Sequence, residues 1–156
     1  MDMTGPSVSD ADVRELENML GTTLPDDYRA FLLDVNGGRP GPDCSLVPLP
    51  REDVLLRDLH SLSTSGAPFD LASRIRRLRT KIPYPLIPIG SAGGAKYGGA
   101  VCLCLEGRMR GSVWYFTLAG DLTPSLLNLP WQDFGNVTQV ADDFLGFVSI
   151  LRPLAS

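Results

Sequence analysis

The fold is decided by Leu24-Pro25-Asp26-Asp27-Tyr28-Arg29-Ala30-Phe31-Leu32-Leu33 and by Asn36-Gly37-Gly38 directly after it. Tyr28, Phe31, Leu32 and Val35 recur at helical spacing, which predicts a helix with one apolar side. Pro25 suits the first helical position, and the helix dipole favours the carboxylates of Asp26 and Asp27 in the first turn. Asn36, Gly37 and Gly38 tolerate the left-handed backbone with which a helix ends.

Three further helices are predicted from caps and apolar spacing. Ser9 and Asp12 resemble a capping box before Val13, Leu16 and Leu20, and Gly21 ends that helix. Asp70 is expected to cap a helix whose buried side carries Leu71, Ile75 and Leu78. For the last helix we expect Thr138 as the cap, Pro153 as the stop, and a buried side of Ala141, Phe144, Leu145, Val148 and Leu151.

Between these helices the pattern changes to that of strands. Residues 44–49 predict an edge strand, and the prolines within residues 82–89 require an extended backbone. Residues 101–105 and 113–118 predict a hairpin, residues 126–129 a further edge strand, and glycine-rich residues 90–99 a loop between strands. Residues 51–68 are ambiguous, with a short helix at 54–62 as one interpretation. The sequence therefore predicts an α+β domain with a mainly antiparallel sheet packed against N-terminal and C-terminal helices.

Composition sets limits on function. The chain has 156 residues, 44% of them apolar, which suffices for one core, and we expect a flexible leader at residues 1–8 and a single domain at 9–153. The net charge of −4 argues against direct binding of nucleic acid. The charge is uneven, since residues 1–50 carry −6, residues 51–81 carry +3 and residues 82–156 carry −1. An acidic first third and a basic middle are candidates for partner selection.

No catalytic or metal-binding set is evident in the sequence. His60 is the only imidazole, and a surface or turn position is favoured for it over a general base. Cys102 and Cys104 lie two apart on a predicted strand and are expected to be small buried apolar residues. We therefore predict no catalytic residues, no metal and no cofactor. Tyr115 is expected on the opposite face from Trp114 and Phe116, where an exposed aromatic ring can anchor a partner.

Targeting features point to the cytoplasm. The first ten residues lack the basic and apolar regions of a signal peptide, and apolar runs are far shorter than the roughly 20 residues of a membrane span. Three cysteines without a Cys-x-x-Cys spacing do not suggest a disulfide framework. A cytoplasmic protein without a membrane segment is expected.

In its order of motifs the chain resembles the SUKH superfamily. The resemblance begins with Leu24-Pro25-Asp26-Asp27-Tyr28 and Asn36-Gly37-Gly38 and continues through Ile82-Pro83 and Leu86-Ile87-Pro88-Ile89-Gly90. It extends over the strand pair at 101–105 and 111–116 and the closing Phe144-Leu145 and Phe147, so it covers nearly the whole chain. The chain departs from many relatives at residues 93–96 and 117–119.

The resemblance implies an α+β fold and, for most bacterial members, an immunity protein that binds and neutralises a cognate polymorphic or contact-dependent toxin, often a nuclease. It implies protein binding rather than catalysis. Other members resemble regulators, including a yeast regulator of cell-wall synthesis, so a regulatory or scaffold protein remains the alternative. The oligomeric state stays open. Two charged sets are candidates for meeting a toxin, one acidic and one basic: Asp26, Asp27, Asp34 and Asp43, and Arg74, Arg76, Arg77 and Arg79.

Overall fold

A computed structural model describes residues 7–50, 52–62, 70–79, 81–93, 98–117 and 137–153. The helices of this part are α1 (Asp10–Leu20), α2 (Asp26–Asp34), the short 3-10 helix η1 (Pro42–Cys44), α3 (Leu71–Arg77) and α4 (Phe144–Ile150). The strands are β1 (Leu46–Pro48), β2 (Asp53–Leu59), β3 (Leu86–Gly93), β4 (Gly98–Cys104), β5 (Val113–Thr117) and β6 (Val137–Ala141). None of the described helices combines the length and apolar character that crossing a bilayer requires.

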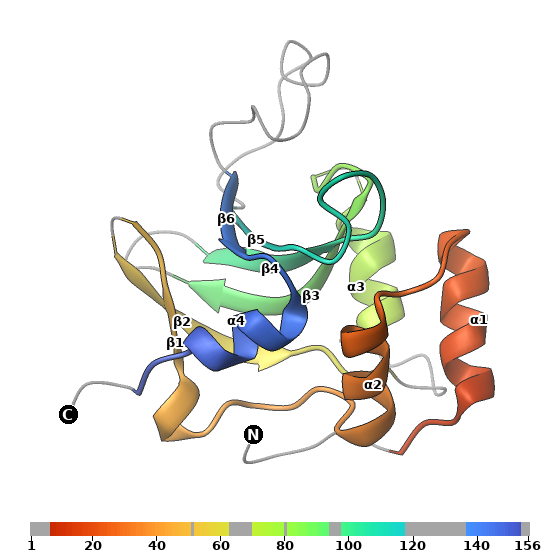
Figure 1. Cartoon of the computed structure of the whole chain (residues 1–156), viewed down its shortest axis with the longest axis horizontal. Coiled ribbons are helices and arrows are strands. Elements are labelled where there is room, and N and C mark those ends of the chain that lie inside the picture. Colours follow the sequence, from red (N-terminus) through yellow and green to blue (C-terminus); the bar gives the residue numbers. More distant parts are fainter. Residues whose placement is uncertain are drawn as a thin grey trace, which may run out of the picture.

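The six strands form one curved sheet in which each strand neighbours the one before it in the chain (Figure 1). All five strand pairs are antiparallel. Beyond β1, an isolated bridge joins Leu46 to Arg152, so the segment after α4 lies along that edge. The α+β class and the antiparallel sheet against terminal helices are confirmed.

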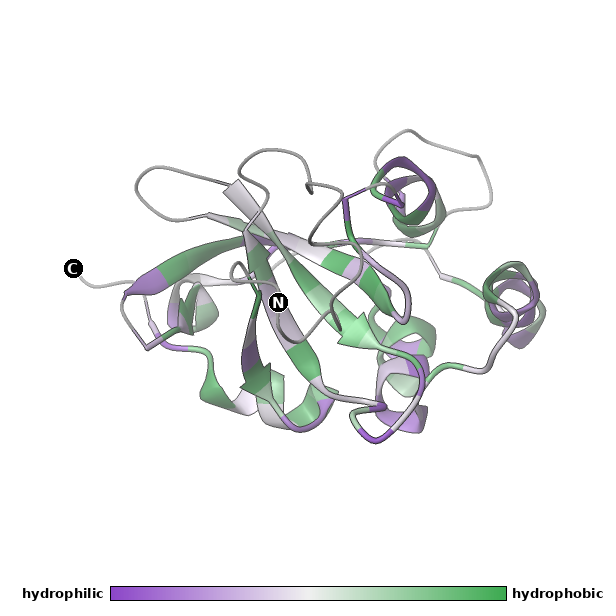
Figure 2. Ribbon diagram, turned by 90° about the horizontal axis from the view of Figure 1, so that it is seen from above, coloured by the Kyte–Doolittle hydropathy of each residue, from purple (hydrophilic) through white to green (hydrophobic). Residues whose placement is uncertain are grey.

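Alternate side chains of the central strands enter two separate apolar clusters. On β5, Val113 and Tyr115 belong to the cluster shared with the helices, whereas Trp114 and Phe116 belong to the cluster on the other face of the sheet. The strands are accordingly mostly green in the hydropathy colouring, while the helices carry purple bands (Figure 2). Burial on both faces is why β3 to β5 are almost continuously apolar.

The predicted helix ends are largely confirmed. Ser9 and Asp12 form a reciprocal capping box at α1, and Gly21 ends that helix with φ of 77°. Asp70 caps α3 by accepting from the Ser73 N–H at 3.0 Å. Pro25 lies one position earlier than predicted, at the N-cap of α2, where it still loses no helical hydrogen bond.

The Asn-Gly-Gly motif after α2 binds the chain that leaves β2. The Asn36 amide donates to Leu62 O at 2.8 Å and accepts from the Leu62 N–H at 2.7 Å, so one side chain replaces a backbone pairing. Gly38 and Leu59 exchange two backbone hydrogen bonds of 2.9 Å. A Cβ on Gly37 would lie 2.6 Å from Leu59 O, and this close approach is the reason for glycine there.

The predicted start of the last helix is wrong. Thr138 lies in β6, paired with Tyr115, and α4 begins only at Phe144 with Asp143 as its cap. The β-branched residues of 137–140 favour pairing with β5 over a helical turn. As a result Phe144 and Phe147 are buried, while Leu145 and Val148, predicted to be buried, are 67% and 39% exposed.

Two further predictions are corrected in the sheet. Residues 54–59 form β2 rather than a short helix, because Val54, Leu56 and Leu59 point into the core. Most of the predicted glycine loop is strand, since β3 runs to Gly93 and β4 starts at Gly98. Gly90 serves close strand approach, because a Cβ there would lie 2.7 Å from Asp58 O. The edge strand predicted at 126–129 lies outside the described residues.

Candidate functional site

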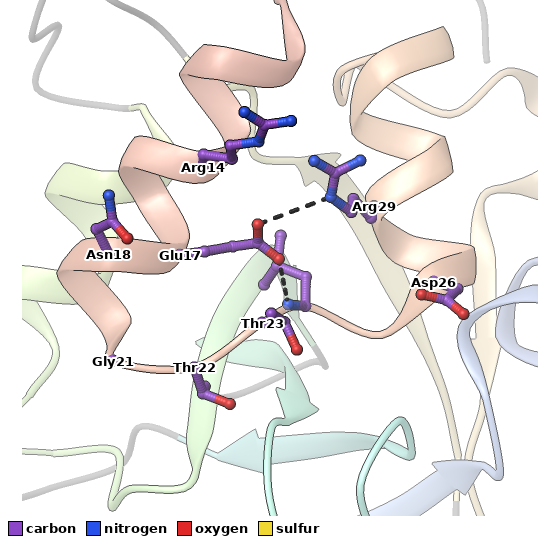
Figure 3. A pocket seen from close by; sticks show the side chains of 9 residues that line it. Arg14, Glu17, Asn18, Gly21, Thr22, Thr23, Asp26 and Arg29 are labelled. Atoms are coloured by element: carbon purple, nitrogen blue, oxygen red, sulfur yellow. Dashed lines mark hydrogen bonds and ion pairs between the residues drawn. The ribbon is translucent and has the colours of Figure 1, made fainter.

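A polar groove of about 830 Å³ lies between α1 and α2 (Figure 3). One wall comes from α1, the floor from the turn that joins the helices, and the other wall from the start of α2. The lining residues are Arg14, Glu17, Asn18, Gly21, Thr22, Thr23, Leu24, Asp26 and Arg29. Arg110 holds the turn against the sheet, because its guanidinium donates to Thr23 O at 3.1 Å and to Thr23 Oγ1 at 3.3 Å. These hydrogen bonds fix the turn, and with it the shape of the groove, relative to the sheet.

Glu17 and Arg29 join the two walls of the groove. The Leu24 N–H donates to Glu17 Oε2 at 2.7 Å, and Arg29 Nε lies 3.7 Å from Glu17 Oε1. Arg29 also pairs with Asp10 Oδ1 at 2.9 Å. Glu17 is only 9% exposed, and a buried carboxylate requires such partners. These charges are satisfied within the protein, so their first role is structural.

Arg14 and Asp26 differ from that network. Both are exposed, and neither forms a hydrogen bond or ion pair with another residue in the described part of the chain. Asp26 lies at the start of α2, where the helix dipole favours its charge. The charged groups of Arg14 and Asp26 are therefore available for contact with a partner.

Asp27, the next residue, holds α4 in place. Its Oδ2 accepts from the Phe144 N–H at 2.9 Å and from the Leu145 N–H at 3.2 Å, and Oδ1 accepts from the Tyr28 N–H at 2.7 Å. Tyr28, Phe31 and Phe144 pack behind it with ring centroids 4.8 to 6.1 Å apart. Asp27 therefore has a structural role, and it sets the exposed Leu145 beside the start of α2.

The remaining acidic candidates lie apart from the groove lining. Asp34 is exposed at the last residue of α2, and Asp43 is exposed in η1. The four aspartates therefore do not form one cluster around the groove, and only Asp26 lines it.

The basic candidates divide in the same way. Arg74 is partly buried and close enough to Asp58 to lower the pKa of that carboxyl. Arg76 reaches across to α1, with Nη1 3.5 Å from Met19 Sδ and Nη2 3.4 Å from Ser73 Oγ. Arg77 and Arg79 are exposed. Of these four arginines, Arg77 and Arg79 are the two whose side chains contact no polar partner among the described residues.

His60 is buried, at 2% exposed, so the surface position favoured from the sequence is wrong. Its Nδ1 lies 3.4 Å from Asp58 Oδ2. Burial acts to raise the pKa of Asp58, but the contact with His60, together with Ser91 and Arg74, lowers it overall. The hydrogen bond from the His60 N–H to Ile89 O, at 2.7 Å, fixes the backbone here. The cluster joins β2, β3 and α3, and its imidazole is buried, so a substrate has little access to it.

Two other predictions concern the sheet. Cys102 and Cys104 are buried in the same apolar cluster, as predicted, and burial raises the pKa of the Cys102 thiol. Tyr115 does face away from Trp114 and Phe116, but it is only 6% exposed, so its prediction as an exposed anchor is wrong. The side of the sheet that it faces is covered by helices, which the strand pattern alone does not reveal.

The groove and the exposed Leu145 were not predicted from the sequence. Glu17 and Arg29 are twelve residues apart, and no short motif links them. The signal for Leu145 was present in Asp143, which is a better cap than Thr138 and shifts the buried side to Phe144 and Phe147.

Comparison with known proteins identifies the family. The model of the SMI1 / KNR4 family (SUKH-1) matches residues 7–150. No curated protein matches the chain. Because the match covers nearly all of the chain, the protein belongs to this family.

Proposed function

We propose that this member of the SMI1 / KNR4 family is an immunity protein that binds a cognate bacterial toxin and neutralises it by protein contact. The observation that carries the proposal is the family match over residues 7–150, together with a braced surface that leaves charged and apolar side chains to a partner. Neutralisation by occlusion needs only a complementary patch held in a fixed shape, which the helices provide.

The placement of the reactive side chains favours binding over catalysis. His60 is buried against Asp58, and the Cys102 thiol is buried with a raised pKa. A thiol becomes a nucleophile as the thiolate, which burial opposes. By contrast, Asp26 and Leu145 are open to solvent, as binding residues must be.

The cytoplasm is the compartment that we propose. Cys44, Cys102 and Cys104 are all free thiols, which suits a reducing environment. A toxin delivered into a cell, or made there, would meet the protein in that compartment.

Co-expression tests the function directly. The gene adjacent to this one is placed under an inducible promoter in a host that lacks this chain, and growth is followed with and without the chain. We expect growth arrest that the chain relieves, and co-elution of the two proteins in size-exclusion chromatography. Absence of both rescue and binding would refute the proposal. A deletion that changes the cell envelope without any toxin would instead support a regulatory protein of the same fold.

A further inference from the structure

We propose that the toxin docks on the α1–α2 groove and on Leu145 beside it, and that the docking segment carries a lysine or arginine next to an apolar side chain. The inference rests on the proposed function and deepens it, because it names the face and the chemistry of the partner. Two independent features carry it: the excess of carboxylates over guanidinium groups on α1 and α2, and an exposed leucine on α4 beside the start of α2.

The charge balance of the two helices favours a basic partner. Together α1 and α2 contain seven carboxylates and two guanidinium groups. Arg29 is already matched by Asp10 and Glu17, and Asp27 is bound to α4. Two side chains that line the groove have no partner in the described part of the chain: Arg14 on α1, and Asp26 at the start of α2, which is left without a cation. A lysine or arginine of the partner would supply that cation without disturbing any contact within the protein.

Leu145 supplies the apolar part of the surface. It is 67% exposed, the highest value among the large apolar side chains described, and Val148 follows one turn later at 39%. The Phe144 and Leu145 N–H groups donate to Asp27 Oδ2, which places Leu145 beside the start of α2, where the neighbouring Asp26 lines the groove. Exposed apolar side chains next to a polar hollow are typical of protein-binding sites.

The size of the groove agrees with this occupant. A volume of about 830 Å³ accommodates a few side chains of a partner rather than a whole helix. Acidic charge around it would attract a basic surface and raise the association rate, most strongly at low salt. The substrate groove of a nuclease is such a surface, because it must hold phosphates. Docking there would occlude the toxin active site.

The basic surface around α3 is the competing candidate, and the structure favours it less. Arg74 and Arg76 are used within the protein, which leaves Arg77 and Arg79. No exposed large apolar side chain lies on α3 in the described part of the chain.

Matched substitutions test the proposal. The partner is the protein encoded by the adjacent gene, inactivated in its own active site, and the dissociation constant is measured by calorimetry at low and high salt. Asp26→Lys and Leu145→Ala change the groove surface. Asp43→Lys and Leu55→Ala make the same changes elsewhere, because Asp43 lies in η1 and Leu55 lines a separate depression on β2. Thermal melting of every variant checks that the fold is kept.

We expect Asp26→Lys and Leu145→Ala each to weaken binding at least about tenfold, and the two controls to stay within about twofold of the wild type. Asp26→Lys should also reduce the salt dependence of binding. The inference is overturned if the wild type binds and neither groove substitution weakens binding, or if only Arg77→Glu and Arg79→Glu weaken it. The proposed function stays intact in both cases. Failure of the wild type to bind overturns both.

Discussion

Replacing Asn36 is the sharpest test of how the family motif holds the fold. The side chain is 2% exposed and makes two hydrogen bonds to the backbone of Leu62, which is itself 5% exposed. Asn36→Ala would leave a buried N–H and a buried C=O of Leu62 without these partners. It would also place alanine at φ of 56°, in the left-handed region.

The expected loss follows from these contacts. A buried polar group without a partner costs about 1–3 kcal/mol, so two cost about 2–6 kcal/mol. The left-handed backbone adds about 1–2 kcal/mol for a residue other than glycine or asparagine. Relaxation and entry of water reduce the sum, and we expect a loss of about 3–5 kcal/mol. Since small domains have about 5–15 kcal/mol in total, the variant should be at the margin of folding.

Asn36→Gly separates the two contributions. Glycine removes the amide but tolerates the backbone angle, so the strain of the alanine variant is relieved. The greater entropy of glycine in the unfolded chain offsets part of this gain, and Asn36→Gly should therefore be about 0.5–1 kcal/mol more stable than Asn36→Ala. Urea unfolding followed by circular dichroism gives both free energies. If both variants lose less than about 1 kcal/mol at an unchanged slope, the Asn36 amide does not hold β2. If glycine restores full stability, the backbone angle alone explains the asparagine.

Three further substitutions follow from the same structure. Gly37→Ala should destabilise the fold by about 2 kcal/mol or more, and Gly21→Ala by only about 1–2 kcal/mol. The two glycines have a similar φ, but a Cβ added at Gly21 would have nothing within 4 Å. Thermal melting of the two variants measures the difference. Asp27→Ala should destabilise the fold by about 1–3 kcal/mol and accelerate hydrogen exchange of the Phe144 and Leu145 amides. Unchanged exchange would contradict the role of Asp27 as acceptor for these two N–H groups. The pKa of Asp58 is below its usual 3.8, so the ionised carboxylate stabilises the fold above that pH, and the stabilisation is lost as pH falls through the lowered pKa. In Asp58→Asn, the free energy of unfolding should therefore fall less steeply with pH below about pH 4. An unchanged pH dependence in that range would contradict this role of Asp58.

The predictions from sequence succeeded where local chemistry decides the structure. Ser9, Gly21 and Asp70 are caps whose side chain or backbone freedom acts within a few residues, and all three are confirmed. The alternation of Trp114, Tyr115 and Phe116 was also confirmed, because neighbouring residues of a strand must face opposite sides.

They failed where distant parts of the chain decide it. Thr138 was predicted as a cap, but pairing with Tyr115 on β5 draws it into the sheet. His60 is buried because Asn36, Gly38 and Ile89 bind the chain around it from two sides. The groove depends on Glu17 reaching Leu24 and Arg29, and Leu145 is positioned by Asp27 from the other end of the chain. No periodicity within a single element contains these contacts.

The contact between Asp27 and α4 also has a consequence during protein synthesis. It joins residues 117 and 118 positions apart in the sequence. While the chain grows on the ribosome, each strand can pair with its predecessor as it emerges, but α2 must wait for its partner at 144–145. The apolar part of the proposed docking surface, Leu145, would therefore be among the last features to take its place, after the groove itself. A nascent chain that ends before residue 144 would have most of its sheet and still lack the contact that joins α2 to α4.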